Sequence, residues 1–491
     1  MVLTTGPITM RTEIIGFTLG ALLTILGIAE LVPALVDWNH GHSNAYVFFM
    51  NALLCLFFGV ALTLSNFKRG KNIGLRESFM LTTLSWVFIS LFGCLPLRMS
   101  DLDISFVDAF FESVSGFTTT GSTVLSGLDT MSQGILIWRS MIQWIGGIGF
   151  IAFALILLPF LQVGGMQLFQ TESSDRSEKI MSKSGQVVFS LFLTYCVLTF
   201  LCAITYFSLG MSWFDAINHA MTTLSTGGYS THDKSFGYFE SSGLQYACAF
   251  FMLAGGLPFI LFVKLFYQQN MSAFFEDEQV RASCFMVVFF TAALSLWLVF
   301  TQGYSWADSV RLTLFNVISI MTTTGYATAD YTLWGTFPIL LFFFVTYLGM
   351  STGSTAGGLK TMRLVIAFRA ALWQFKTIIY PNGIFTQRYQ GRPVDQALVS
   401  TVLGFLSLYV VTNAFMTLFL AFCGLDFVTA ITAAATALAN VGPGLGDIIG
   451  PAGNFSSFPD AAKWIMCVGM ILGRLEILTV FVLFTTYCWT K

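Results

Sequence analysis

The chain has 491 residues, of which 55% are hydrophobic and only 10% are charged. Soluble proteins carry about 25% charged residues, so an array of soluble domains is excluded. Apolar runs of about 20 residues recur from end to end, which is the length that a helix needs to cross a bilayer. The formal net charge of −2 offers no basic surface for nucleic acid. Membrane lipid is therefore the expected surrounding, and nucleic acid is not an expected partner.

The hydrophobic runs predict an all-α polytopic membrane protein. Ten spans are predicted, the eighth of them interrupted, at 14–36, 45–65, 78–97, 135–161, 186–209, 243–267, 282–302, 334–375, 396–423 and 461–488. Lys and Arg give the orientation, because cytoplasmic loops carry an excess of them. With both termini in the cytoplasm, 17 of the 23 basic residues fall on the cytoplasmic side, whereas 12 of the 15 aspartates fall on or near the outer side. We therefore expect a multi-pass plasma-membrane protein with cytoplasmic termini.

Four further segments are too apolar for ordinary loops and too short to cross, and all of them fall on the outer side. They are 106–120, 213–226, 306–324 and 427–441. Each is predicted to be a short helix that enters the membrane and turns back, which requires cover by protein or by a water-filled cavity. Each runs into a polar segment that bears glycine. These segments are Thr118–Ser122, Ser225–Tyr229, Thr322–Tyr326 and Asn440–Gly444.

The four copies predict an internal repeat. The glycines at 121, 227, 325 and 442 are separated by 106, 98 and 117 residues, and recurrence at such a period indicates repeated units. A two-span addition at 1–70 would precede pore repeats at 71–165, 166–275, 276–385 and 386–491. We expect the four covalently linked units, each a span, a pore helix, a filter segment and a second span, to surround a pseudo-fourfold pore.

Glycine lets the backbone turn carbonyl groups toward a common axis, and rings of carbonyls can replace the hydration shell of a potassium ion. None of the four segments contains a carboxylate, which suits a weakly hydrated monovalent cation better than a divalent one. Asp108, Asp215 and Asp308, near the starts of the short helices, are interpreted as helix caps. The predicted potassium-binding residues are Thr119, Thr120, Gly121, Ser225, Thr226, Gly227, Thr323, Thr324, Gly325, Asn440, Val441 and Gly442.

An aspartate follows each of these glycines by 8, 6, 5 and 5 residues, at Asp129, Asp233, Asp330 and Asp447. Together they could form an acidic outer vestibule that concentrates cations. They could equally be turn residues, since Asp is common in turns. The sequence leaves both interpretations open.

The eighth span contains four glycines and several hydroxyl residues between 349 and 358, which disfavours a continuous helix. We predict a movable constriction there, although a helix-packing surface of small residues is the alternative. Arg474 lies in the middle of the run 461–488, where a charge is costly. We expect it to bond carbonyls of this segment, or else a carboxylate such as Glu112. The predicted gate residues are Ser351, Thr352, Gly353, Ser354, Thr355, Gly357, Gly358 and Arg474.

Several motifs resemble the membrane subunit of bacterial Trk potassium uptake systems, of the TrkH and TrkG type, in the Trk/Ktr/HKT superfamily. Besides the four filter segments they are Trp138–Met141 with Gly146 and Gly147, Ser351–Ser354, Gly450–Phe455 and Gly473–Glu476. The resemblance implies potassium uptake across the bacterial inner membrane by a homodimer. It also implies a cytosolic NAD- or ATP-binding regulatory subunit of the TrkA type, and a gate loop that faces an arginine of the fourth repeat.

Some alternatives stay open. Sodium-preferring relatives resemble this pattern with serine at the first filter glycine, so Gly121 favours potassium. Transport of Na+, or K+/Na+ or K+/H+ symport through the same pore, is the main alternative, and the sequence does not distinguish passive from coupled transport. An intramembrane enzyme built on Asp215 and His219 is a remote alternative, because no partnered nucleophile accompanies them. No organic cofactor is expected on this chain.

Overall fold

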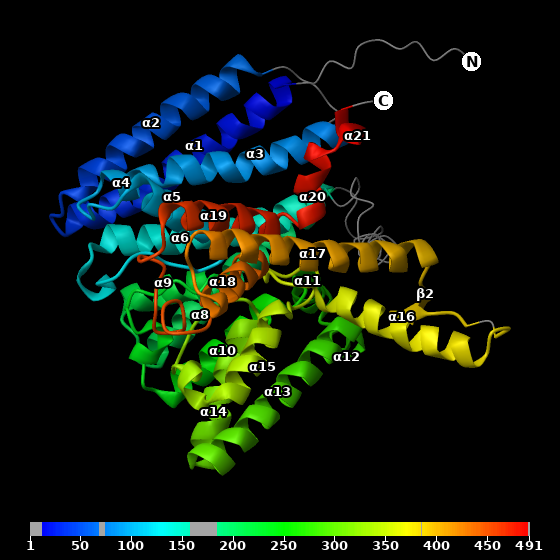
Figure 1. Cartoon of the computed structure of the whole chain (residues 1–491). Helices are drawn as coiled ribbons and strands as arrows, with labels where there is room; N and C mark the ends of the chain where they lie inside the picture. Colours follow the sequence, from blue (N-terminus) through cyan, green and yellow to red (C-terminus); the bar gives the residue numbers. More distant parts are fainter. Residues whose placement is uncertain (1–11, 68–73, 158–183, 384, 490–491) are drawn as a thin grey trace, which may run out of the picture.

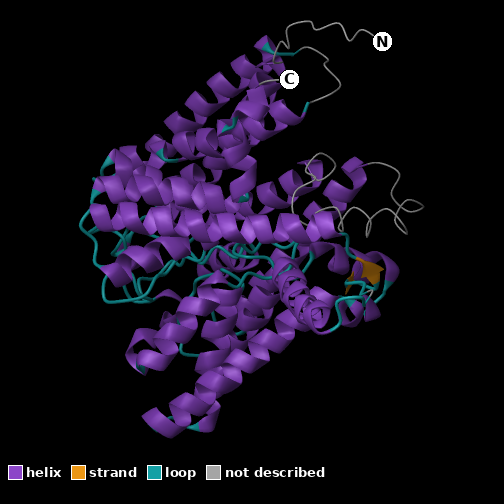
Figure 2. Cartoon of the chain, turned by 45° about the vertical axis from the view of Figure 1, so that its right-hand side comes forward, coloured by secondary structure: helices purple, strands orange, loops and turns teal. Residues whose placement is uncertain are grey.

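The computed structural model describes residues 12–67, 74–157, 184–383 and 385–489. Their regular structure is helical (Figures 1 and 2), apart from one short antiparallel hairpin of β1 (Arg388–Tyr389) and β2 (Arg392–Pro393). The predicted repeat boundaries at 70/71 and 165/166, and the end of the fourth predicted span at 158–161, lie outside the described residues.

Six described helices are long and apolar enough to cross a membrane, which establishes a polytopic membrane-type fold. They cover the predicted first, second, third, fifth, seventh and ninth spans. The fourth predicted span is occupied by the 25-residue helix α6 (Gln133–Leu157). The six are α1 (Thr12–Asn39), α2 (Asn44–Ser65), α3 (Leu75–Gly93) with its continuation α4 (Leu95–Met99), α8 (Ser184–Ser208), α13 (Glu278–Gln302) and α17 (Gln396–Phe422).

Two spans that were predicted to be continuous are broken. In the sixth, α10 (Ser242–Gly256) and α11 (Phe259–Gln268) meet at 97°. Pro258 causes this break, because proline has no N–H and pushes the preceding residue into an extended conformation. In the tenth, α19 (Asp460–Arg474) ends before α20 (Ile477–Phe481), and the chain bends by 108° where Glu476 takes a φ of +61°. The sequence prediction was wrong on both.

After α20 the chain ends in η4 (Val482–Phe484) and α21 (Thr486–Trp489). The eighth predicted span is interrupted as expected. Its halves are α15 (Thr336–Tyr347) and α16 (Thr361–Ile379), and residues 348–360 between them are not helical. Figure 1 shows α16 and the start of α17 extending from the body of the molecule as an arm.

Four short helices occupy the predicted re-entrant segments. They are α5 (Phe106–Phe117), α9 (Trp213–Leu224), α14 (Trp306–Met321) and α18 (Phe427–Ala439). The first three begin in the same way: Ser105, Ser212 and Ser305 accept a bond from the backbone N–H three residues on, and donate to the carboxylate of that residue. This reciprocal cap places the three aspartates at the helix starts, as predicted, but the capping residue is the serine. Asp426 caps α18 directly.

The N-terminal helix pair is fixed to the rest of the molecule through buried polar bonds. Asp37, at the end of α1, accepts bonds from the backbone nitrogen of Gly134 at 2.7 Å and from the hydroxyl of Ser132 at 3.1 Å. These groups lie at the start of α6, where free N–H groups favour a carboxylate. Further helices between α8 and α17 are α12 (Ser272–Glu276) and the single turn η3 (Tyr331–Trp334). The turns η1 (Leu128–Thr130) and η2 (Ser235–Tyr238) follow α5 and α9.

Candidate ion-binding site

The four short helices end in the same backbone conformation. The first residue with positive φ is Thr119, Thr226, Thr323 or Asn440, at 52° to 57°, and a glycine with positive φ follows two residues later. The residue between them donates its N–H to the carbonyl five residues back, at 2.8 to 3.1 Å in all four. Such bonds satisfy the free carbonyls of a helix end. The four glycines are Gly121 (87°), Gly228 (78°), Gly325 (80°) and Gly442 (103°).

This geometry corrects the predicted register of the second segment. The sequence prediction aligned Gly227 with the other three glycines, but Gly228 has the shared conformation, and Gly227 takes the place of Thr120, Thr324 and Val441. The prediction overlooked that Gly228 precedes Tyr229 as Gly325 precedes Tyr326, which already favours Gly228 over the adjacent Gly227. The backbone distinguishes them, because only Gly228 has a φ in the left-handed region.

The four segments touch in a closed ring. A Cβ atom added to each of the first three glycines would collide with a carbonyl oxygen of the next segment in chain order. A Cβ atom added to the fourth glycine would collide with a carbonyl oxygen of the first segment, which closes the ring. Only glycine permits so close an approach. We call these four oxygens, of Thr120, Gly227, Thr324 and Val441, the carbonyl ring. The added Cβ would lie 2.2 Å from the Gly227 oxygen at Gly121, 1.8 Å from the Thr324 oxygen at Gly228, 2.1 Å from the Val441 oxygen at Gly325 and 2.8 Å from the Thr120 oxygen at Gly442.

Most of the predicted hydroxyl and amide ligands are engaged with protein groups. Thr120 pairs with Thr118 at 2.7 Å and accepts a bond from Asn440 at 3.0 Å. Thr323 accepts the backbone N–H of Gly357 at 2.7 Å, which joins its segment to the interrupted span. Among the described residues, no three His, Cys, Asp or Glu side chains come together as metal ligands. Backbone oxygens are candidate cation ligands here, as are Oγ1 of Thr119 and Oδ1 of Asn440, for which the described residues provide no hydrogen bond.

A cavity lies against the four glycines, and we call it the glycine cavity. Of the four predicted vestibule aspartates, Asp233 lines it, and its carboxylate accepts the N–H groups of Gly127 and Leu128 at 3.0 and 3.1 Å. The other three do not line it. Asp129 bonds His232 at 2.5 Å, Asp330 caps η3, and Asp447 is exposed.

Partial burial lowers the pKa of His232, but the nearby carboxylates of Asp215 and Asp129 outweigh burial and leave that pKa above its ordinary value. The same bond to His232 lowers the pKa of the Asp129 carboxyl. His219, which the sequence paired with Asp215, bonds only the backbone carbonyl of Asp215 and the hydroxyl of Ser230, at 2.9 and 3.1 Å. Its surroundings are aromatic, with the rings of Phe236, Phe239 and Tyr326 within 5.8 Å.

The non-helical residues 348–360, which we call the loop, pack into the break between α10 and α11. Ser351 and Thr355 donate their N–H groups to the carbonyls of Gly256 and Gly255, both at 3.2 Å. Arg474 is fully buried and reaches this loop, where its guanidinium donates a hydrogen bond to the backbone carbonyl of Thr355 at 2.7 Å. The alternative partner Glu112 is engaged elsewhere, with Arg139 at 2.9 Å.

The chain matches the family model described as "TrkH: Cation transport protein" over residues 44–488. It is 42% identical over 474 residues to the Trk system potassium uptake protein TrkI of Halomonas elongata, covering 96% of each chain. The chain belongs to the TrkH family. The Trk system potassium uptake protein TrkH of Escherichia coli K12 is 34% identical, with 96% of this chain and 98% of that protein covered. The crystal structure of the potassium transporter TrkH from Vibrio parahaemolyticus superposes with a TM-score of 0.91 at 32% identity, over 98% of this chain and 100% of that one. The TrkH family consists of transporters, not enzymes.

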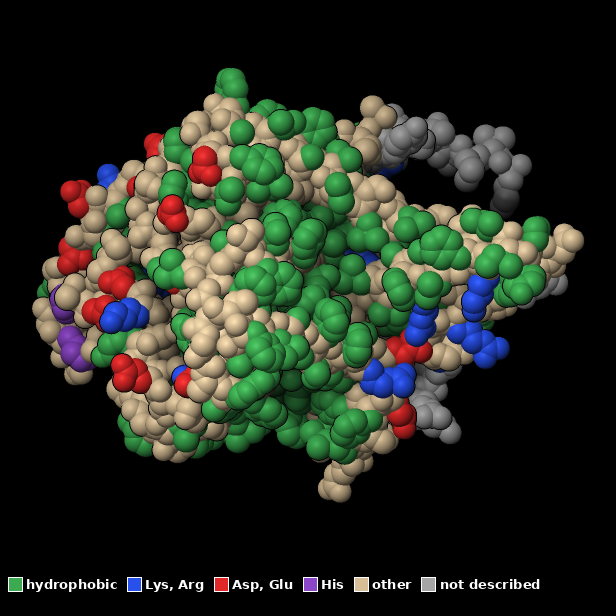
Figure 3. All heavy atoms as spheres, turned by 60° about the horizontal axis from the view of Figure 1, so that its bottom comes forward, with side chains coloured by type: hydrophobic (Ala, Val, Ile, Leu, Met, Phe, Trp, Pro, Cys, Tyr) green, Lys and Arg blue, Asp and Glu red, His purple; other side chains and the backbone are tan. Residues whose placement is uncertain are grey.

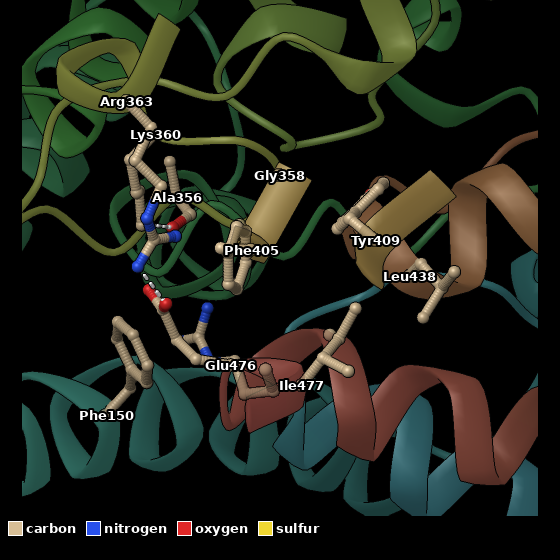
Figure 4. A pocket seen from close by; sticks show the side chains of 13 residues that line it. Phe150, Ala356, Gly358, Lys360, Arg363, Phe405, Tyr409, Leu438, Glu476 and Ile477 are labelled. Carbon is tan, nitrogen blue, oxygen red and sulfur yellow. Dashed lines mark hydrogen bonds and ion pairs between the residues drawn. The ribbon is translucent and has the colours of Figure 1, made fainter. Parts of the chain in front are cut away.

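A second cavity, the loop cavity, holds charges that the sequence did not connect. Lys360, Arg363, Arg474 and Glu476 line it beside Phe150 and Phe405. Figure 4 shows Arg363 pointing at Glu476, with which it forms an ion pair, and its guanidinium lies 3.9 Å from the Phe405 ring centre. Residues 363 and 476 are 113 positions apart, and no sequence motif of this TrkH-family chain predicts that they pair. The break at Glu476, which brings them together, was not predicted.

Proposed function

We propose that the chain takes up potassium ions across the bacterial inner membrane through the carbonyl ring. The observation that carries this proposal is the closed contact of four segments with the same backbone conformation, in a chain whose relatives are named potassium uptake proteins. Four carbonyl oxygens around one axis would replace the hydration shell of K+. The four units, with boundaries as predicted from sequence, would surround the pore, and the two N-terminal helices would be an addition.

The loop and Arg474 form the gate in this proposal. Glycine-rich backbone changes conformation easily, and the guanidinium bonded to Thr355 places a positive charge beside the ion path. The hydrogen bond from the Gly357 N–H to the Thr323 hydroxyl would transmit movement of the loop to the ring. We further propose a homodimer and a cytosolic nucleotide-binding partner of the TrkA type that moves the gate. Coupled transport of Na+ or H+ is the alternative, and no described contact favours it.

The surface charges support the proposed orientation. In Figure 3, most acidic side chains and the histidines gather at one end, a group of Lys and Arg lies at the other, and hydrophobic side chains cover the surface between. Cytoplasmic surfaces carry the excess of Lys and Arg, so the end with α16 would face the cytoplasm.

The test is rubidium and sodium uptake into liposomes that contain the purified full chain. Gly325→Ser should lower the ratio of rubidium to sodium uptake by about tenfold, since it brings a side chain against the Val441 oxygen and strains a left-handed residue. Gly303→Ser is the matched control: Gly303 also has a positive φ, of 71°, but no atom lies within 4 Å of an added Cβ. Equal effects of the two variants, or no rubidium flux into liposomes holding the unaltered chain, would overturn the proposal.

A further inference from the structure

The carbonyl ring is not uniform. The residue before the ring glycine is Thr120, Thr324 or Val441 in three segments, but it is Gly227 in the second. A Cβ atom added to Gly227 would lie 2.4 Å from Cδ and 2.5 Å from Oε1 of Gln143. The side-chain space at this one position is therefore filled by Gln143, which comes from α6.

Gln143 bonds the ring itself. Its Nε2 donates to the Gly227 carbonyl at 2.6 Å, and its Oε1 accepts the N–H of Tyr229 at 3.0 Å. The Tyr229 N–H can only donate, which fixes the orientation of the amide. The side chain is completely buried. No side chain in the described parts of the chain donates to the corresponding oxygens of Thr120, Thr324 or Val441.

The same helix is anchored one turn earlier. Arg139 donates to Glu112 at 2.9 Å and to the Ser230 carbonyl at 3.1 Å, and its guanidinium lies 4.2 Å from the centre of the Tyr229 ring. Arg139 and Gln143 therefore hold residues 227–230 from one rigid helix, so that the glutamine amide has little freedom to follow the Gly227 oxygen.

We propose that Gln143 is a selectivity-determining residue of the carbonyl ring; this rests on the proposed function of the ring. A carbonyl that already accepts a short N–H bond offers a weaker field to a cation, and weaker fields favour larger ions. The bond also resists movement of the Gly227 oxygen toward the axis, which binding of the smaller Na+ requires. Both effects favour K+ over Na+.

The test compares rubidium and sodium uptake by liposomes containing Gln143→Leu, which keeps the size of the side chain without its donor. We expect the rubidium-to-sodium ratio to fall by about three- to tenfold, the size of one hydrogen bond, with the amount of folded protein measured in parallel. Gln245→Leu is the matched control, because Gln245 is also buried and donates to a carbonyl, that of Phe239 at 3.1 Å, outside the ring. An unchanged ratio for Gln143→Leu overturns the inference if Gly325→Ser still lowers it. If Gly325→Ser has no effect either, the proposed function of the ring fails instead.

A second measurement covers the case in which Gln143→Leu does not fold. Gly227→Ala should reduce folded protein and uptake in the unaltered chain, because of the 2.4 Å contact with Gln143. In a Gln143→Ala background the space is free, so the same change should be tolerated. The double variant Gln143→Ala with Gly227→Thr would then carry threonine at this position, as the first and third segments do at Thr120 and Thr324. We expect it to fold and to have a lowered rubidium-to-sodium uptake ratio, because the Gln143 donor is gone. Equal harm from Gly227→Ala in both backgrounds would contradict the proposed contact.

Discussion

The glycine cavity and the loop cavity differ in how their charges are paired. At the glycine cavity, the buried cation Arg139 has the carboxylate of Glu112 at 2.9 Å, and His232 lies between two aspartates. The residues that line the loop cavity include three cations but one carboxylate, that of Glu476, which pairs with Arg363. Arg474 bonds carbonyl groups there, and its guanidinium lies 4.3 Å from the ring centre of Phe150.

The difference separates two uses of a buried arginine. A paired arginine such as Arg139 is required for the stability of the folded protein, because removing either charge of the pair leaves the other buried without compensation. An arginine bonded only to carbonyls, such as Arg474, leaves no opposite charge behind when it is removed. The charges of the glycine cavity are therefore tied to one another, whereas the charge of Arg474 has no opposite charge as its partner, which suits the gate proposed above.

The largest expected effect is on folding. Arg139→Leu should destabilise the protein by about 3–5 kcal/mol, because Glu112 would be left buried without its partner. Size-exclusion profiles and melting temperatures of the detergent-solubilised protein would measure this. Arg369→Leu, which breaks a partly exposed pair with Glu278, should cost less than about 1 kcal/mol. Adding Glu112→Gln to Arg139→Leu should recover part of the loss. An Arg139→Leu protein as stable as the Arg369→Leu protein would remove the contrast between the two cavities.

The next effect is on transport rather than on folding. Arg474→Ala should raise rubidium flux by at least about tenfold, since it removes a charged hydrogen bond of roughly 1.5–3 kcal/mol that would hold the proposed gate closed. The melting temperature should fall less than in Arg139→Leu, because no buried opposite charge is left behind. Arg474→Lys keeps the charge and should raise flux less. Flux that falls in step with the amount of folded protein would show that Arg474 is structural, like Arg139.

The sequence predicted much of this fold, because hydrophobic length and serine or aspartate caps act locally. The four short helices lie at the segments where apolar character indicated them, and in three of them an aspartate near the start was interpreted as a cap. The two broken spans show the limit of hydrophobicity. Residues 461–488 form one apolar run, and the bend within it places Glu476 in a tertiary ion pair with Arg363 that the run does not indicate. Pro258, in contrast, was a local signal for the sixth span that the prediction overlooked.

The site was predicted less completely than the fold. Glycine and hydroxyl residues indicated where the segments lie, and their four copies indicated a common role. The register of the second segment was predicted wrongly, although Gly228-Tyr229 matches Gly325-Tyr326 in the sequence. Gln143, Glu112 and Arg139 were missed as a group, although two of them share a helix face at positions i and i+4. Their partner segments lie more than 80 residues away along the chain, and nothing local indicates such a pairing.

A smaller effect concerns the paired charges at the glycine cavity. The pKa of His232 is raised by Asp215 and Asp129, so its protonated form stabilises the folded protein. That contribution is complete below the unfolded pKa of about 6.5 and is lost as pH rises through the higher folded pKa. The melting temperature should therefore fall by about 1–2 °C between roughly pH 6 and pH 9, and His232→Gln should abolish that dependence. A dependence that persists in His232→Gln would assign it to other groups.

The smallest expected effect concerns the outer aspartates. Replacing Asp129, Asp233, Asp330 and Asp447 together with Asn should raise the external rubidium concentration for half-maximal uptake by about twofold at low salt, and less at high salt, where charges are screened. Asp233→Asn alone should give most of the change, because Asp233 is the one of the four aspartates that lines the glycine cavity. The single amide oxygen of Asn can still accept one of the two N–H groups, of Gly127 or Leu128, that the carboxylate accepts. Asp447→Asn is the control, since Asp447 is exposed and outside the cavity lining. If the fourfold variant keeps the affinity of the unaltered chain at low salt, the aspartates serve only as turn and cap residues, and the glycine cavity attracts cations through its backbone oxygens alone.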